Sequence, residues 1–199
     1  MPKAGKVKKG YAISIENVAP FLWYRVGISD KSELGVRVGL PIYGSGVDYS
    51  RVLYKKKNKW DMLNLAWSLN PNYNLDATYY KFKTKKTDAD FLKSRWLGFR
   101  MMSIQKGITG GTSNRFGFLY GIQSSPRWGM EFGYFHDSSS IPITDIFSSN
   151  WDPFSSDNHD RYSKKPIRDE TSGLPSEFSR MTGLSFSLFF DLDAPKKKK

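Results

Sequence analysis

The feature of this chain that most restricts its fold is an alternation of apolar and polar residues with a period of two. Successive side chains of a β-strand point to opposite faces of a sheet, so this period predicts strands with one apolar and one polar face. In residues 182–192, leucine and phenylalanine at the even positions oppose mainly glycine, serine and aspartate at the odd ones. Residues 33–41, 60–70 and 115–123 repeat the pattern. The chain is therefore predicted to be all-β.

About ten such segments follow one another along 199 residues, a length that suits one domain. Their predicted bounds are residues 11–17, 20–28, 33–41, 47–54, 60–70, 75–82, 92–105, 115–123, 128–135 and 182–192. Segment 75–82 fits either register, because aromatic residues stand at both odd and even positions. We expect one up-and-down antiparallel transmembrane β-barrel over residues 11–192, with about ten strands and a range of about eight to twelve.

The composition of the two faces indicates what surrounds them. The polar face consists mostly of Gly, Ser, Ala and Asn, which suit a crowded barrel interior better than the Lys-, Glu- and Thr-rich exterior of a soluble sandwich. The apolar face is aliphatic and aromatic on nearly every segment, as contact with lipid requires. The charged residues predicted to line the lumen are Arg25, Arg37, Asp48, Arg100 and Glu131. Because both signs occur, these charges can neutralise one another inside a narrow lumen.

The connections between the segments have unequal lengths on the two sides of the predicted barrel. No apolar run approaches the roughly 18 residues of a spanning helix, so strands are the candidate for crossing a membrane. Short turns are expected on one side, at residues 29–32, 55–59, 83–90 and 124–127. The other side carries residues 17–19, 41–45, 71–73, 106–113 and a long polar excursion over 137–177. Short turns on one rim and longer loops on the other are typical of outer-membrane barrels.

The net charge of +12, with 16% aromatic residues, raises the alternative of a basic soluble β-protein that binds nucleic acid. The lysines gather in residues 3–9 and 196–199 and at the predicted turns 55–59 and 83–86, so solvated turns and basic tails at 1–10 and 193–199 are favoured. Nucleic acid is therefore not the favoured partner. Residues 1–10 have the positive charge of a signal peptide without the apolar segment that should follow. Either a leader has been removed or the chain stays in the cytoplasm.

The sequence does not contain the residues or motifs that several kinds of functional site require. The chain has no cysteine, which excludes disulfides, thiolate metal sites and a cysteine nucleophile. The Gly-rich residues 107–111 lack the Lys-Ser/Thr of a phosphate loop, and residues 115–120 lack a glycine of the RNA-recognition motif. His159 lies among loop carboxylates and is interpreted as solvated rather than as a metal ligand. No cofactor is expected.

Three segments resemble parts of small Gram-negative outer-membrane barrels. Residues 24–39 (YRVGISDKSELGVRVG) and 120–134, with its Ser-Pro-Arg-Trp turn, are similar to hairpins of that group. Residues 184–190 (LSFSLFF) resemble the terminal-strand signal read by the barrel assembly machinery, although residues 191–199 follow where that signal normally ends the protein. The resemblance implies a bacterial outer-membrane location, contact with outer-membrane lipid and insertion by that machinery. The alternating lipid-type faces, without a convincing catalytic set, predict a structural barrel or a narrow porin-like channel without catalysis.

His136 and Ser138 supply an enzymatic alternative. A His-x-Ser at the end of an apolar register resembles outer-membrane lipid A deacylases, in which a histidine activates a barrel-surface serine and a carboxylate orients the histidine. The resemblance implies Ser138 as the nucleophile and His136 as its base. The sequence departs from that family at Ser139-Ser140, where Asn-Ala is expected, and no carboxylate can be assigned. A rim histidine that begins a Ser-rich loop is the favoured interpretation, so catalysis is not expected.

Overall fold

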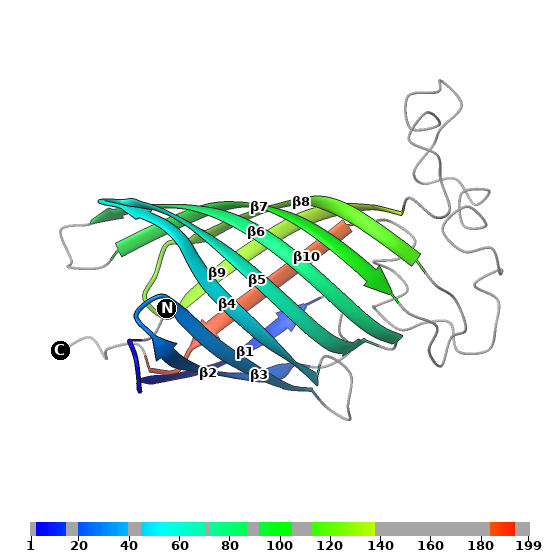
Figure 1. Ribbon diagram of the computed structural model, residues 1–199, viewed down its shortest axis with the longest axis horizontal. Coiled ribbons are helices and arrows are strands. Elements are labelled where there is room, and N and C mark those ends of the chain that lie inside the picture. Colours follow the sequence, from blue (N-terminus) through cyan, green and yellow to red (C-terminus); the bar gives the residue numbers. More distant parts are fainter. Residues whose placement is uncertain are drawn as a thin grey trace, which may run out of the picture.

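The computed structural model describes residues 3–14, 20–39, 45–70, 72–86, 92–104, 113–137 and 184–193. These residues form one closed antiparallel barrel, in which sequential strands pair with each other and β1 pairs with β10 (Figure 1). The ten strands are β1 (Val7–Ser14), β2 (Phe21–Ser29), β3 (Ser32–Gly39), β4 (Ser45–Lys56), β5 (Lys59–Asn70), β6 (Asn72–Lys86), β7 (Leu92–Ile104), β8 (Ser113–Gln123), β9 (Trp128–Asp137) and β10 (Leu184–Asp191). The prediction of an all-β up-and-down barrel is confirmed.

The two ends of the barrel carry different connections. β1 begins and β10 ends at the end that holds the turns after β2, β4 and β8, which we call the turn end (left in Figure 1). The pairs β1–β2, β3–β4, β5–β6, β7–β8 and β9–β10 connect at the opposite end, which we call the loop end. The described residues contain no helix long and apolar enough to cross a membrane.

Two lysine-rich stretches that the sequence placed in turns belong to strands instead. β4 continues through Lys56 and β6 through Lys86, so the turn between β4 and β5 is reduced to Lys57 and Asn58. Lys57 takes the left-handed conformation of this tight turn, with φ at 45°. The lysine content predicted turns because lysine favours contact with water. The ends of strands are also exposed to water, so the backbone pairing can continue through these lysines. β1 likewise begins at Val7, inside the predicted basic tail, because residues 7–10 pair with β2.

Inner-face glycines make room for large side chains on neighbouring strands. Trp96 lies directly opposite Gly121, where an added Cβ atom would meet Cε2 of the indole at 1.9 Å. The other pairs of this kind are Gly10 with Trp23, Gly98 with Tyr80, Gly117 with Phe135, Gly129 with Phe189 and Gly133 with Leu119. Each large side chain therefore extends over a neighbouring strand toward the lumen instead of colliding with it.

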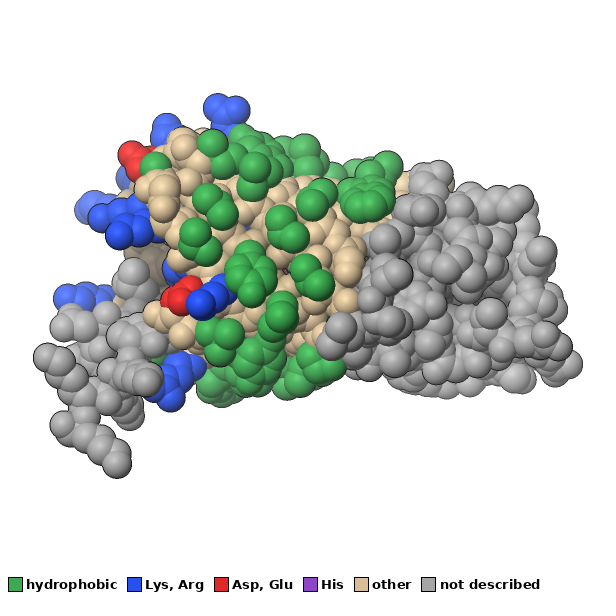
Figure 2. Space-filling view, turned by 90° about the horizontal axis from the view of Figure 1, so that it is seen from below, with side chains coloured by type: hydrophobic (Ala, Val, Ile, Leu, Met, Phe, Trp, Pro, Cys, Tyr) green, Lys and Arg blue, Asp and Glu red, His purple; other side chains and the backbone are tan. Residues whose placement is uncertain are grey.

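The outer face of the barrel is apolar on all ten strands. Phe118, Leu97 and Met101 are the most exposed members, with 71%, 62% and 60% of their surface accessible. Other members, strand by strand from β1 to β10, include Ile13, Leu22, Val36, Val47, Leu65, Leu75, Phe99, Tyr120, Phe132 and Leu184. Figure 2 shows this apolar belt over the middle of the barrel, with lysine and arginine gathered toward the turn end.

Candidate functional site

The inner faces of β2 to β5 carry a hydrogen-bonded polar group that we call the Arg25 cluster: Arg25, Glu33, Asp48, Ser50 and Asn64. The Arg25 guanidinium lies 2.5 Å from Glu33 Oε1 and 3.1 Å from Asp48 Oδ2, and donates to Ser50 Oγ at 3.4 Å. Asn64 Nδ2 donates to Asp48 Oδ2 and to Ser50 Oγ, both at 2.9 Å. Glu33 and Asp48 are only 3% and 5% exposed, so the folded barrel depends on Arg25 to compensate two buried carboxylates.

A second polar group, the Arg100 cluster, lies on the inner faces of β6, β7 and β9. Arg100 Nε donates to Thr78 Oγ1 at 2.8 Å, and its Nη2 donates to the Tyr80 hydroxyl at 3.0 Å. Glu131 Oε1 lies 3.8 Å from Arg100 Nη2, while Glu131 Oε2 accepts a hydrogen bond from Trp96 Nε1 at 2.7 Å. The single carboxylate of this group is thus held by one ion pair and one hydrogen bond from a neutral donor.

The glycines of β8 allow the Arg100 cluster to reach from β7 to β9. Trp96, Gly121 and Glu131 lie in one row across the three strands, so the indole passes over a glycine to reach the carboxylate. The next row of the same kind consists of Arg100, Gly117 and Phe135. The Arg100 guanidinium carbon lies 5.6 Å from the centre of the Phe135 ring, within cation–π range.

Aromatic rings occupy the turn half of the lumen. Trp60 on β5 and Phe82 on β6 are stacked with ring centres 3.8 Å apart. Trp96 continues the group, with its ring centre 5.5 Å from that of Phe82 and 5.8 Å from that of Phe189 on β10. These rings pack with aliphatic side chains into one hydrophobic group, which we call the aromatic cluster and whose buried members are Met62, Tyr80, Trp96, Leu119 and Phe135. The described inner faces of β5 to β10 are therefore in side-chain contact at this level.

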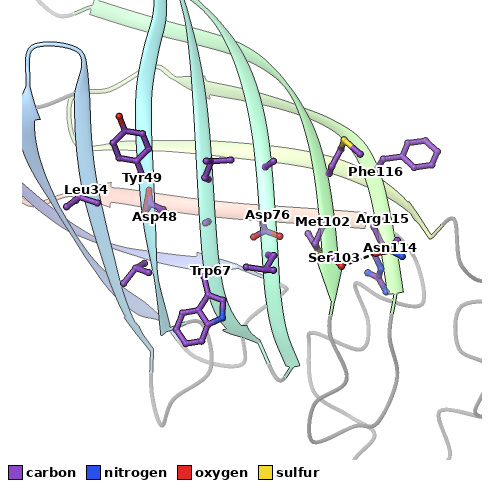
Figure 3. A pocket seen from close by; sticks show the side chains of 16 residues that line it. Leu34, Asp48, Tyr49, Trp67, Asp76, Met102, Ser103, Asn114, Arg115 and Phe116 are labelled. Carbon is purple, nitrogen blue, oxygen red and sulfur yellow. Dashed lines mark hydrogen bonds between the residues drawn. The ribbon is translucent and has the colours of Figure 1, made fainter.

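A hollow of about 740 Å³ borders β3 to β8 toward the loop end (Figure 3). Asp48, Asp76 and Arg115 are its charged inner-face residues. Most of the remaining border is apolar and includes outer-face residues such as Val47 and Leu65. A border of this composition does not define a polar binding site, so we assign no solute to the hollow.

The five residues predicted to line the lumen all occupy inner-face positions. Arg25 and Asp48 meet in the Arg25 cluster, and Arg100 and Glu131 meet in the Arg100 cluster. Arg37 stands apart from both, between Trp23 and Gly46 in the register of β2, β3 and β4. Its Nε and Nη2 atoms are buried and have no hydrogen-bond acceptor in the described part of the chain.

The charges predicted to line the lumen did not include Glu33, Asp76 and Arg115, which also lie on the inner face. Glu33 and Arg115 share the parity of inner-face glycines two residues along their strands, so a stricter use of the alternation would have found them. Asp76 lies in the segment whose register the sequence left open. With these additions, the inner-face arginines at 25, 37, 100 and 115 are balanced by the carboxylates of Glu33, Asp48, Asp76 and Glu131.

His136 continues the outward register of β9, opposite Phe116 on β8. It is only 3% exposed, and its ring meets that of Phe116 edge-on at 5.5 Å. The enzymatic alternative also needs Ser138, which lies outside the described residues, as does His159. In the described ranges no group of three or more His, Asp or Glu side chains has a metal-binding arrangement.

No family model, curated protein or solved structure matches this chain. Its function therefore has to be inferred from the two faces of the barrel. The described inner faces carry a packed hydrophobic cluster and two ion-paired polar clusters, whereas the outer face carries exposed apolar residues on every strand.

Proposed function

We propose that the chain is an integral protein of a bacterial outer membrane, with a structural role as a barrel whose interior is filled. The observation that carries this proposal is the apolar belt, to which every strand contributes. A soluble monomer rarely exposes contiguous apolar patches above a few hundred Å². A belt that encircles a barrel is matched by the hydrocarbon layer of a membrane, and the closed ladder leaves no unpaired strand edge to face lipid.

Further features support this environment. The strands have 8 to 15 residues, and a tilted crossing needs about 9–11. An even number of strands agrees with the single-chain barrels of bacterial outer membranes. The resemblance of residues 184–190 to a terminal-strand signal favours the barrel assembly machinery as the partner during insertion.

The filled interior supports a structural role rather than a channel. The Arg25 cluster, the Arg100 cluster and the aromatic cluster occupy the inner faces of β2 to β10 between them. An open pore would need a continuous water-filled path past these side chains. We therefore place the chain among membrane barrels whose lumen is packed by side chains.

Arginine at the middle of the belt tests the membrane proposal. Phe118→Arg is expected to lower the free energy of unfolding in lipid vesicles by about 2 kcal/mol or more, because a cation at the bilayer midplane loses hydration. Urea unfolding followed by tryptophan fluorescence measures the change. Phe118→Ala is the first control, since it removes the ring contact with Phe99 at 5.4 Å without adding charge.

Leu53→Arg is the second control, because Leu53 is 56% exposed but lies near the turn end of β4. There the cost should shrink to about 0–1 kcal/mol, since the guanidinium reaches the interface. Equal effects at both positions, or no loss of stability for Phe118→Arg, would show that the belt does not lie in lipid.

Conductance in planar bilayers separates a filled barrel from a channel. The wild-type protein is expected to leave the bilayer at its baseline conductance, because its rings and ion pairs occupy the lumen. The triple substitution Phe82→Ala, Trp96→Ala, Phe189→Ala should introduce stepwise openings, since it removes three rings in mutual contact, two of which cover the inner-face Gly121 and Gly129. Regular ion-selective steps from the wild-type protein would instead assign a channel function.

A further inference from the structure

Cations stand directly opposite one another on three neighbouring strands at the turn end. Lys59 on β5 pairs with Lys83 on β6, and Lys83 pairs in turn with Arg95 on β7. Lys85 and Lys93 form a second row beside the first. All five side chains are exposed and share the outer face, and opposite residues of a ladder have Cβ atoms about 4.5–5.5 Å apart. We call these five residues the cation rows.

Nothing in the described part of the protein neutralises the cation rows. Like charges placed directly opposite destabilise a sheet. None of the five side chains takes part in an ion pair or hydrogen bond found among the described residues. Asp61 is the one carboxylate on the described outer face of β5 to β7, and its Oδ2 accepts the Tyr79 hydroxyl at 2.7 Å. The described strands therefore leave these cations open to an added anion.

The cation rows lie where the apolar belt ends. Leu97, which is 62% exposed, follows Arg95 on the same face of β7, about 6.6 Å along the strand. On β6 and β5 the apolar residues begin one position further along, because Lys81 and Asp61, which stand opposite each other, precede Tyr79 and Leu63 on this face. Lysine and arginine stems can lie along apolar surface while their charged heads reach the interface. If the belt lies in hydrocarbon, these heads lie at the depth of the lipid headgroups.

We propose that the cation rows bind the phosphates of anionic phospholipids in the leaflet around the turn end. This inference rests on the proposed membrane location. Anionic leaflets attract basic clusters close to their surface. A phosphate between adjacent strands meets two or three cations at once, and the guanidinium of Arg95 can hold it with two parallel hydrogen bonds. The repulsion within the rows is then replaced by attraction.

The test compares the full chain in phosphatidylcholine vesicles with and without phosphatidylglycerol. The wild-type urea midpoint should be higher with phosphatidylglycerol, and native mass spectrometry should find that lipid retained on the protein. The variant Lys59→Gln, Lys83→Gln, Arg95→Gln should lose this preference by about fivefold for each cation removed. In phosphatidylcholine alone the same variant should have a higher midpoint than the wild type, because the like-charge contacts are gone. The sign of its effect therefore reverses with lipid composition.

A matched variant removes three lysines from the same end without touching the cation rows: Lys31→Gln, Lys55→Gln, Lys57→Gln. Lys31 and Lys57 lie in turns, and Lys55 is opposite Trp60 rather than a cation. This variant should keep most of the preference for phosphatidylglycerol. If it loses as much as the row variant, a diffuse basic rim accounts for binding and the specific role of the rows is refuted.

The remaining outcomes separate this inference from the membrane proposal. Insertion with equal midpoints in both vesicles overturns lipid binding by the rows and leaves the barrel proposal intact. Failure to insert into either vesicle overturns the membrane proposal itself. Salt-sensitive binding of a DNA duplex that only the row variant loses, without any effect of phosphatidylglycerol, would reassign the rows to nucleic acid.

Discussion

Replacing Arg25 by leucine is expected to destabilise the barrel by about 3–5 kcal/mol, the usual cost of removing one partner from a buried ion pair. Glu33 and Asp48 both depend on this guanidinium, at 2.5 Å and 3.1 Å, and neither carboxylate is more than 5% exposed. Their hydration is lost on folding, so an uncompensated pair of negative charges would remain inside the wall. Urea unfolding in lipid vesicles measures the loss.

A charge-neutral version of the same cluster is the control for this prediction. The triple variant Arg25→Leu, Glu33→Gln, Asp48→Asn keeps the approximate shape of the cluster and removes all three charges. It should recover most of the lost stability, because neutral replacements of buried ion pairs are often tolerated. If the triple variant is as unstable as the single one, the loss comes from packing around Arg25 rather than from unpaired carboxylates.

Replacing Gly117 by valine is expected to cost more than about 3 kcal/mol, at or beyond the upper end of ordinary overpacking. A Cβ atom at this position would lie 1.9 Å from the carbonyl oxygen of Tyr134 and 2.7 Å from Phe135 Cδ1. Because the nearer atom belongs to the backbone of β9, rotating a side chain cannot relieve the clash. The loss of the compact, heat-modifiable band in electrophoresis would report failure to close the barrel.

Gly121→Ala provides the comparison, since the three nearest atoms to its Cβ all belong to the Trp96 side chain. Trp96→Leu should therefore restore a barrel that carries Gly121→Ala. Phe135→Leu should fail to restore one that carries Gly117→Val. Equal rescue in both cases would mean that the clash at Gly117 is with the Phe135 ring and not with the backbone.

The sequence of each strand predicts which face of the barrel a residue of the candidate site occupies. It does not predict which residues of different strands contact each other. Arg25, Arg37, Asp48, Arg100 and Glu131 could be placed on the inner face from their parity alone. Two contacts depend on which residues stand opposite each other in paired strands. These are the bridge from Arg25 to two carboxylates and the hydrogen bond from Trp96 to Glu131 across β8. No local pattern contains this information, since the partners are up to 35 residues apart in sequence.

The sequence by itself determined the all-β class, an approximate number of strands and the assignment of most strand residues to an inner or an outer face. It could do so because a period of two is a property of the strand backbone and is read within a few residues. Only the tertiary structure decided the register, and with it the two polar clusters, the pairing of glycines with large side chains and the cation rows. Lysines 55, 56 and 83 illustrate the difference. The sequence alone predicted them to lie in turns, whereas in the structure they pair with neighbouring strands and belong to β4 and β6. Register belongs to the closed barrel as a whole, since one slipped pair would move every side chain of that strand to the opposite face.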